Sequence, residues 1–206
     1  MHVNSMSHSR TNSRSILPAG LLCMCFLLAS CASVPDASRV TQATPQLQVN
    51  VPQLHVPRAG LMTGGQPEGN AWRDLRAAGV TRVVNLLSAS ELGSRNEAGE
   101  VQASGMDYVQ IGVAGPGDLT PENARLLWQS VQGDSGTVLV HCASGNRAGA
   151  LLALAAVQAG GMSPQAALEF GKAAGLTKLE PVVRERLGLP SLASEPSLCA
   201  ASAPNC

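Results

Sequence analysis

Aromatic side chains are scarce in this sequence. Its 206 residues include two Trp, one Tyr and two Phe. A hydrophobic core must therefore be built largely from Leu, Val and Ala. Such a core suits a small parallel sheet covered by helices, because the strands of that kind of sheet are buried on both faces and consist of runs of β-branched residues.

An excess of charge of one sign is also lacking. The chain has 14 basic and 14 acidic residues, so the two signs cancel. A balanced chain produces no strong field that would attract nucleic acid, and we expect no nucleic-acid partner. No His, Cys and Asp residues stand at metal-ligand spacing, and no Gly-rich nucleotide fingerprint is present outside residues 141–150. We therefore expect neither a metal nor a cofactor.

The sequence has no apolar run long enough to span a membrane. An uncharged stretch, Ile16 to Ser30, follows Arg10 and Arg14 and falls short of the roughly 20 residues that a spanning helix needs. It ends in Leu-Ala-Ser directly before Cys31, which is similar to a bacterial lipoprotein signal. That resemblance implies a signal peptide over residues 1–30 and a lipid on Cys31. An ordinary secretory peptide, in which Cys31 has no role, is the alternative.

The lipoprotein interpretation predicts a location. The N-terminal lipid would hold the protein on the membrane of the bacterial envelope, facing the periplasm. Ala32 rather than Asp follows the lipidated residue, a pattern similar to that of outer-membrane lipoproteins. In this oxidising compartment Cys199 and Cys206 either close a small disulfide loop or remain free thiols, and both alternatives stay open.

The remainder of the chain divides into a tether, one domain and a tail. Residues 31–57 are rich in Ser, Gln, Pro and Val and are typical of a flexible tether, residues 58–190 form the domain, and residues 191–206 form a C-terminal tail. Strands alternate with helices in the domain, which predicts an α/β fold with a small parallel sheet flanked by helices. The expected strands are 61–62 (at a sheet edge), 80–87, 107–113 and 136–140, and the expected helices are 70–78, 91–104, one that opens at 121, 150–160, 163–174 and 180–187. Asn70, Thr120 and Ser163 are the expected N-caps of three of these helices, and prolines open the two at 121 and 164.

One segment carries a chemical signature. A cysteine stands at the end of a Val-rich strand, on a tight loop, just before a helix, in the run His141-Cys142-Ala143-Ser144-Gly145-Asn146-Arg147. The backbone N–H groups of such a loop converge on one point, and the helix N-terminus adds unpaired donors and a positive dipole. Arg147 adds a planar fork that can bind two oxygens of a tetrahedral anion. The same field favours the thiolate of Cys142, so the pattern predicts a nucleophile beside an anion-binding loop.

At these residues the chain resembles the cysteine-dependent phosphatases of the protein tyrosine phosphatase superfamily. Within it, the sequence is most similar to the bacterial group called beta-lactamase-hydrolase-like, which resembles compact dual-specificity phosphatases. The early segment Gly65-Gln66-Pro67, followed by a helix and a Val-rich strand, is part of the likeness, which spans roughly Arg58 to Leu189. The resemblance implies a dual-specificity-phosphatase-like fold and hydrolysis of phosphate monoesters through a phosphocysteine on Cys142. It also implies that residues 141–147 bind the phosphate.

The chain departs from the superfamily pattern in two places. Four residues, Ala143 to Asn146, separate Cys142 from Arg147, where most of the superfamily has five. Ala148 stands where a hydroxyl residue often follows the arginine. The shorter spacing also resembles the active loop of rhodanese-type sulfurtransferases, in which Cys142 would carry a persulfide. A lipoprotein that binds an anion without catalysis is a third interpretation.

The resemblance also implies a general acid. Phosphatases of this type use an aspartate on a mobile loop to protonate the leaving oxygen, and Asp118 stands in a Gly-containing loop just beyond a predicted strand. A turn-forming role would equally explain Asp118. Glu122 is a weaker candidate because a role at its helix start already accounts for it, and Glu91 and Arg95 are interpreted as surface charges. The substrate is predicted to be a phosphorylated molecule of unknown class.

The histidine before the nucleophile has a predicted supporting role. As the last strand residue, His141 is expected to orient the loop by hydrogen bonding, while its donor or positive charge assists Cys142. Ser144 is expected either to donate to the thiolate or to satisfy a loop carbonyl.

Overall fold

The computed structural model describes residues 49–132 and 136–192. The strands are β1 His55–Arg58, β2 Leu61–Gly64, β3 Val80–Asn85, β4 Asp107–Gln110 and β5 Thr137–His141. The helices are α1 Ala71–Ala77, α2 Ala89–Leu92, α3 Glu97–Ala103, α4 Pro121–Val131, α5 Asn146–Gln158, α6 Pro164–Ala173 and α7 Glu180–Arg186, with a short 3₁₀ turn η1 at Pro116–Asp118.

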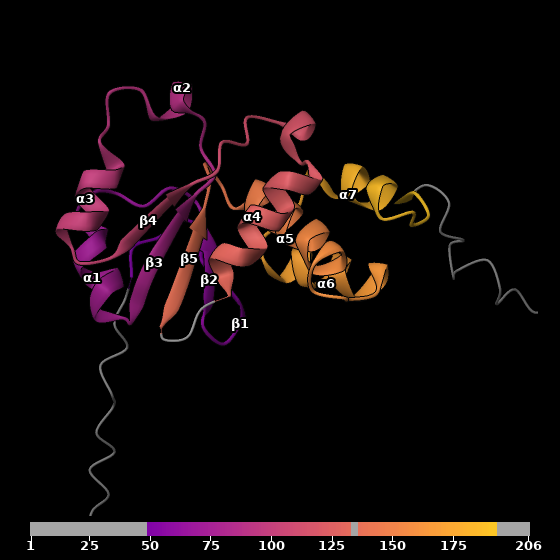
Figure 1. Ribbon diagram of the computed structural model, residues 1–206, viewed down its shortest axis with the longest axis horizontal. Coiled ribbons are helices and arrows are strands. Elements are labelled where there is room, and N and C mark those ends of the chain that lie inside the picture. The colour runs from indigo at the N-terminus through magenta and orange to yellow at the C-terminus, as the bar shows by residue number, and fades with distance from the viewer. Residues whose placement is uncertain (1–48, 133–135, 193–206) are drawn as a thin grey trace, which may run out of the picture. The chain divides into compact units, whose positions relative to one another are not determined.

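The five strands form one sheet in the order β1-β2-β5-β3-β4 (Figure 1). Strand β1 pairs with β2 antiparallel, and the other pairs are all parallel. The fold class predicted from the sequence is confirmed, with one antiparallel strand added at an edge. Strand β5 lies at the centre of the sheet, so the loop that follows it opens at the middle of the carboxyl edge, where ligands bind in α/β folds.

Helices cover both faces of the sheet (Figure 1). Helices α1 and α3 pack on one face, where Trp72, Leu75 and Val101 are fully or almost fully buried against Val83 and Leu139 of the sheet. Helices α4 to α7 lie on the other side, and their core is aliphatic, as the shortage of aromatic residues requires. The sheet is thereby buried on both faces, which explains the continuous apolar run Val138 to Val140 in the central strand β5.

Two helix starts follow the predicted capping chemistry. The Thr120 hydroxyl accepts a hydrogen bond from the Asn123 N–H, and Pro121 occupies the first position of α4. The Ser163 hydroxyl does the same for α6, which also opens on a proline. Both of these caps are confirmed, whereas the cap predicted at Asn70 is wrong, because its side chain makes no cap hydrogen bond to α1.

The edge strand on the β2 side of the sheet differs from the prediction. The sequence predicts that Leu61 and Met62 form an edge strand, but β2 lies between β1 and β5, and Leu61 is completely buried. The edge is β1, which begins at His55, inside the segment interpreted as tether. Strand β1 alternates between half-buried and exposed residues, so it lacks the apolar run by which the buried strands are recognised.

The helix predicted over 91–104 is wrong as a single element. Gly93 ends α2 with a φ of 58°, and α3 begins only after Asn96, whose side chain accepts a hydrogen bond from the Gly99 N–H. A positive φ interrupts the helical hydrogen-bond ladder at low energetic cost only at glycine. The break separates Glu91 from Glu97, and the two carboxylates occupy different surroundings.

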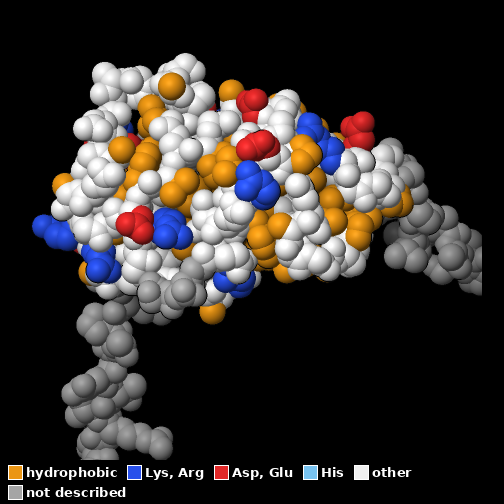
Figure 2. All heavy atoms as spheres, in the orientation of Figure 1, with side chains coloured by type: hydrophobic (Ala, Val, Ile, Leu, Met, Phe, Trp, Pro, Cys, Tyr) orange, Lys and Arg blue, Asp and Glu red, His pale blue; other side chains and the backbone are white. Residues whose placement is uncertain are grey.

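Acidic and basic side chains are interspersed on the face of the domain shown in Figure 2. In the described part of the chain, no helix combines the length and the hydropathy needed to cross a membrane. The predicted signal peptide, Cys31, Cys199 and Cys206 lie outside the described residues.

Candidate active site

The predicted catalytic loop, residues 142–145 between β5 and α5, holds the predicted nucleophile. Cys142 follows directly after β5, and its side chain is almost fully buried, with 1% exposure. Gly145 caps α5 with a φ of 81°, a left-handed conformation that an L side chain rarely adopts. The helix therefore begins at Asn146, earlier than the predicted residue 150, and Arg147 lies in its first turn. The first N–H groups of α5 have no acceptor within the helix, so they remain available to an anion.

The neighbouring strand supports this loop. The Cys142 N–H donates to the Gly64 carbonyl at 3.3 Å, and Gly65 pairs with Ser144. The side chain of Asn146 contacts the segment between α6 and α7. Its Oδ1 accepts hydrogen bonds from the N–H of Thr177 at 2.8 Å and from the Thr177 hydroxyl at 3.2 Å. The Oδ1 of Asn146 is therefore used by the segment after α6, while its backbone N–H, at the start of α5, has no acceptor within the helix.

The guanidinium of Arg147 is held by two protein partners. Its Nη1 donates to Glu91 Oε2 at 2.8 Å and to the Val113 carbonyl at 2.5 Å, and its Nη2 donates to Glu91 Oε1 at 2.6 Å. These bonds use three of the five N–H donors of the guanidinium. The remaining two, on Nε and Nη2, lie along one edge of the planar group. That edge can bind two oxygens of a tetrahedral anion.

The ion pair changes the titration of both partners. The hydrogen bond from Arg147 lowers the pKa of Glu91 to about 2, against the effect of burial and with help from the Ser88 backbone. The pKa of Arg147 is raised mainly by its hydrogen bonds to Glu91, against the effect of burial, and further by the charge of Cys142 and a hydrogen bond to it. Since the other three donors are used, the Cys142 sulfur faces the Nε/Nη2 edge of the guanidinium, and an anion bound at that edge would take over the donor that contacts the sulfur. The structure brings the predicted cysteine and arginine together.

Solved structures resemble this fold. A DUF442 protein from Shewanella putrefaciens CN-32, named as a candidate phosphatase, is 26% identical, and the match covers 66% of this chain and 91% of that chain with a TM-score of 0.51. A candidate phosphatase from Neisseria meningitidis Z2491 is 19% identical, with 65% and 94% coverage and a TM-score of 0.53. Tk-PTP in its active form is 20% identical, with 66% and 96% coverage and a TM-score of 0.51.

The domain has a protein tyrosine phosphatase-like fold. The likeness to the two structures below 25% identity concerns the fold alone. No protein-family model matches the sequence, and no curated protein matches it.

Directly before the catalytic loop, His141 belongs to a buried polar network. Its Nε2 lies 2.9 Å from Glu97 Oε1, and both side chains are completely buried. The carboxylate of Glu97 also accepts hydrogen bonds from the amides of Asn85 at 2.7 Å and Gln66 at 3.0 Å, and Arg95 Nη1 lies 3.7 Å from it. Glu97 thus joins β3, β5 and the segment after β2 from its position on α3.

The network favours an ionised Glu97. Burial acts to raise the pKa of this carboxyl, but the hydrogen bond and charge of His141, with the Gln66 amide and the Arg95 charge, hold it below its ordinary value. Since a carboxylate only accepts, Nε2 of His141 carries a proton. The other ring nitrogen, Nδ1, is buried and has no hydrogen-bond partner. His141 is thus positioned by α3, and its ring makes no hydrogen bond to the catalytic loop, in contrast to the prediction.

Asp118 lies in a closed turn. Its Oδ2 accepts hydrogen bonds from the N–H groups of Ala114 at 2.9 Å and Gly115 at 3.4 Å, in the segment that leaves the same edge of the sheet as the catalytic loop. Arg186 of α7 donates to the carbonyls of Leu119 and Pro116 on either side of it, the second at 2.7 Å. The carboxylate therefore stabilises its own turn in this conformation, and a catalytic role requires that turn to open or shift.

Two charged residues were misinterpreted from the sequence. Glu91, interpreted as a surface charge, holds Arg147, and Arg95 pairs with Glu100 at 2.7 Å and lies over the ring of Trp72. The alternative acid Glu122 is exposed and pairs with Arg125 on its own helix. In the described residues, no cluster of three or more His, Cys, Asp or Glu side chains could hold a metal.

Glu97 was not among the functional residues predicted from the sequence. One signal could have led to it: Asn85 interrupts the apolar run Val83 to Leu87, and a buried polar residue needs a partner. Nothing in the spacing of the chain indicates that this partner comes from α3.

Proposed function

We propose that this protein is a cysteine-dependent phosphatase that hydrolyses phosphate monoesters. The free Nε/Nη2 edge of Arg147 is the observation that carries the proposal. It stands beside Cys142 at the N-terminus of α5, so a phosphoryl group there would meet backbone donors, a bidentate cation and a nucleophile together. The 26% identical DUF442 protein, named as a candidate phosphatase, supports the same activity.

The first chemical step transfers the phosphoryl group to sulfur. The Cys142 thiolate attacks phosphorus in line, an S–P bond forms, and the P–O bond to the leaving group breaks. Arg147 and the loop amides bind the equatorial oxygens, on which charge accumulates in the transition state. Asp118 is the proposed acid that gives its proton to the leaving oxygen.

The second step regenerates the enzyme. Water attacks the phosphocysteine, Asp118 accepts the proton from the water, and inorganic phosphate leaves as the thiolate reforms. Before the first step, the hydrogen bonds between Asp118 and the N–H groups of Ala114 and Gly115 must be exchanged for a contact to the ester oxygen. Gly115 and Gly117 flank this turn in open space, which leaves room for that movement.

A beta-lactamase-hydrolase-like subgroup assignment is part of the proposal and rests on the sequence likeness. The four-residue spacing between Cys142 and Arg147 also favours a rhodanese-like sulfurtransferase. The two functions are separated by assaying purified residues 32–206 in parallel for hydrolysis of an aryl phosphate and for sulfur transfer from thiosulfate to cyanide. Hydrolysis without sulfur transfer is expected. Sulfur transfer without hydrolysis would replace the proposal.

We further propose that the protein works in the bacterial envelope, held by a lipid on Cys31 and facing the periplasm, with the outer membrane as the favoured site. The support is the sequence before Cys31 and the Ala that follows it. The phosphorylated substrate would then be one present at that membrane or in the periplasm.

A further inference from the structure

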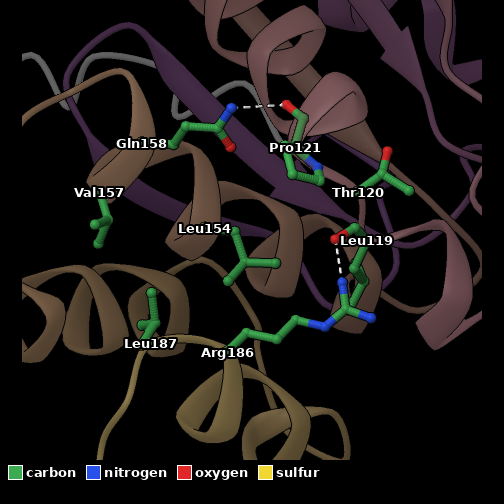
Figure 3. Close-up of a pocket in the computed structure, with 8 residues that line it drawn as sticks. All are labelled: Leu119, Thr120, Pro121, Leu154, Val157, Gln158, Arg186 and Leu187. Carbon is green, nitrogen blue, oxygen red and sulfur yellow. Dashed lines mark hydrogen bonds between the residues drawn. The ribbon is translucent and has the colours of Figure 1, made fainter.

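A cavity of about 430 Å³ lies between the start of α4, the second half of α5, and α7 (Figure 3). Its walls are largely aliphatic and include Leu119, Leu154, Val157 and Leu187. The cavity is separate from the catalytic loop, because neither Cys142 nor any other residue of that loop lines it. An aliphatic cavity of this size is suited to bind an alkyl group.

One cation stands at this aliphatic cavity. In Figure 3, Arg186 reaches from α7 toward Leu119 along the edge of the cavity. Its guanidinium donates to the Leu119 and Pro116 carbonyls and forms no ion pair within the described residues, whereas Arg147 pairs with Glu91. Two of its five donors are thus used on neutral acceptors, and the others are left for a ligand.

These features together define an amphipathic site. We propose that the cavity binds a single-chain aliphatic carboxylate, with the alkyl chain between Leu154, Val157 and Leu187 and the carboxylate on Arg186. Burial of each methylene supplies affinity, and the charge of the guanidinium selects an anion over a cation or a neutral chain. Thr120, the N-cap residue of α4, also lines the cavity.

Occupancy of the site is coupled to the loop that contains Asp118. The guanidinium that binds the ligand also holds the carbonyls of Pro116 and Leu119, on either side of that residue. A carboxylate is a stronger acceptor than a carbonyl, so it draws the guanidinium away from the loop. This consequence rests on the proposed function: a turn released from Arg186 opens more readily, so the bound carboxylate should speed the hydrolysis of esters with poor leaving groups and leave that of activated esters unaffected.

Calorimetry with decanoate tests the binding itself. We expect the full chain to bind decanoate and not decyltrimethylammonium, which has the same alkyl chain and the opposite charge. Octanoate should bind about fifteenfold more weakly than decanoate, since it lacks two methylenes and each buried methylene is worth about 0.8 kcal/mol, or roughly a fourfold change in affinity. Arg186→Gln should weaken decanoate binding by tenfold or more, and Arg186→Lys by less. Arg125→Gln, which removes an exposed arginine of α4, is the matched control and should have no effect.

A second variant addresses the cavity directly. Val157→Phe places a larger side chain in the cavity and should abolish decanoate binding while circular dichroism shows the native helix content. Absence of binding by the full chain, equal binding of the two ions of opposite charge, or unchanged binding by both Arg186→Gln and Val157→Phe would each overturn the proposal. If decanoate binds only to a chain that ends at Leu192, and not to the full chain, the occupant of the cavity is the C-terminal segment and the proposal is overturned. Calorimetry needs no turnover, so its result is independent of the proposed phosphatase activity.

Discussion

Replacing Arg147 by Lys tests the geometry of the anion site. The arginine has five N–H donors, of which two bind Glu91, one binds the Val113 carbonyl, and two remain for a substrate. A lysine has three donors on a single nitrogen. If it keeps the contacts to Glu91 and Val113, it has none left for phosphate oxygens, and if it turns to the phosphate, it releases Glu91.

The expected loss follows from this count. Removing one preorganised donor to a transition-state oxyanion typically costs about 10²–10³ in rate, and the lysine variant loses a bidentate pair while retaining the charge. We therefore expect kcat/KM for an aryl phosphate to fall by about 10²–10³ in Arg147→Lys. The affinity for inorganic phosphate should fall less, since the loop amides and the charge remain.

Steady-state hydrolysis and a rapid-quench measurement of the phosphoryl-transfer step are the assays. Arg125→Lys is the matched control, because Arg125 is an exposed arginine paired with Glu122 on α4, and it should keep full activity. A loss of tenfold or less in Arg147→Lys would show that the guanidinium does not contact the transition state. The reasoning from its free edge would then be refuted.

Four further changes have separate expected outcomes. Cys142→Ser should abolish turnover while vanadate still binds; more than a few per cent of the activity in a clean preparation would contradict covalent catalysis. Asp118→Asn should slow the hydrolysis of esters with poor leaving groups by about 10²–10⁴, whereas equal slowing of activated esters would make Asp118 a turn residue. Glu97→Gln should lower the unfolding free energy by about 1–3 kcal/mol at pH 7 in urea titrations, because donors of the network lose their acceptor. The pKa of Glu97 is depressed in the folded state, so the stability that its carboxylate contributes is fully present above the ordinary pKa of 4.5 and is lost as the pH falls through the lower pKa of the folded state. A difference in unfolding free energy between wild type and variant that stays constant down to acid pH would contradict this. Cys31→Ala should release the protein from membranes, and a variant that still pellets with them would refute lipid anchoring.

The parts of the fold that follow local rules could be predicted from the sequence. The Val-rich runs of β3 and β5, the Thr120 and Ser163 caps and the prolines that open α4 and α6 all depend on residues within one turn of each other. The cysteine loop has the same local character, since strand, loop and helix follow one another directly. These elements were placed correctly, with boundaries shifted by a few residues.

The contacts that the sequence could not indicate join distant segments. Glu91 and Arg147 are 56 residues apart, and Glu97 and His141 are 44 apart. A glutamate in a polar stretch has the same local pattern whether it faces solvent or reaches a buried partner. The break at Gly93 decides between these outcomes, because it lets α2 place Glu91 at the catalytic loop while α3 turns Glu97 into the interior.

The burial of Cys142 also determines how the protein responds to oxidants. A thiolate held beside a guanidinium reacts with small peroxides that can enter the anion site, and the product is a sulfenic acid. Cys142 is the one free cysteine in the described part of the chain, and its side chain is 1% exposed. No second thiol of the described fold is available to trap the sulfenic acid as a disulfide. Recovery of oxidised protein would then depend on a small external thiol that fits where phosphate binds, and bound phosphate would protect the sulfur from both oxidation and repair.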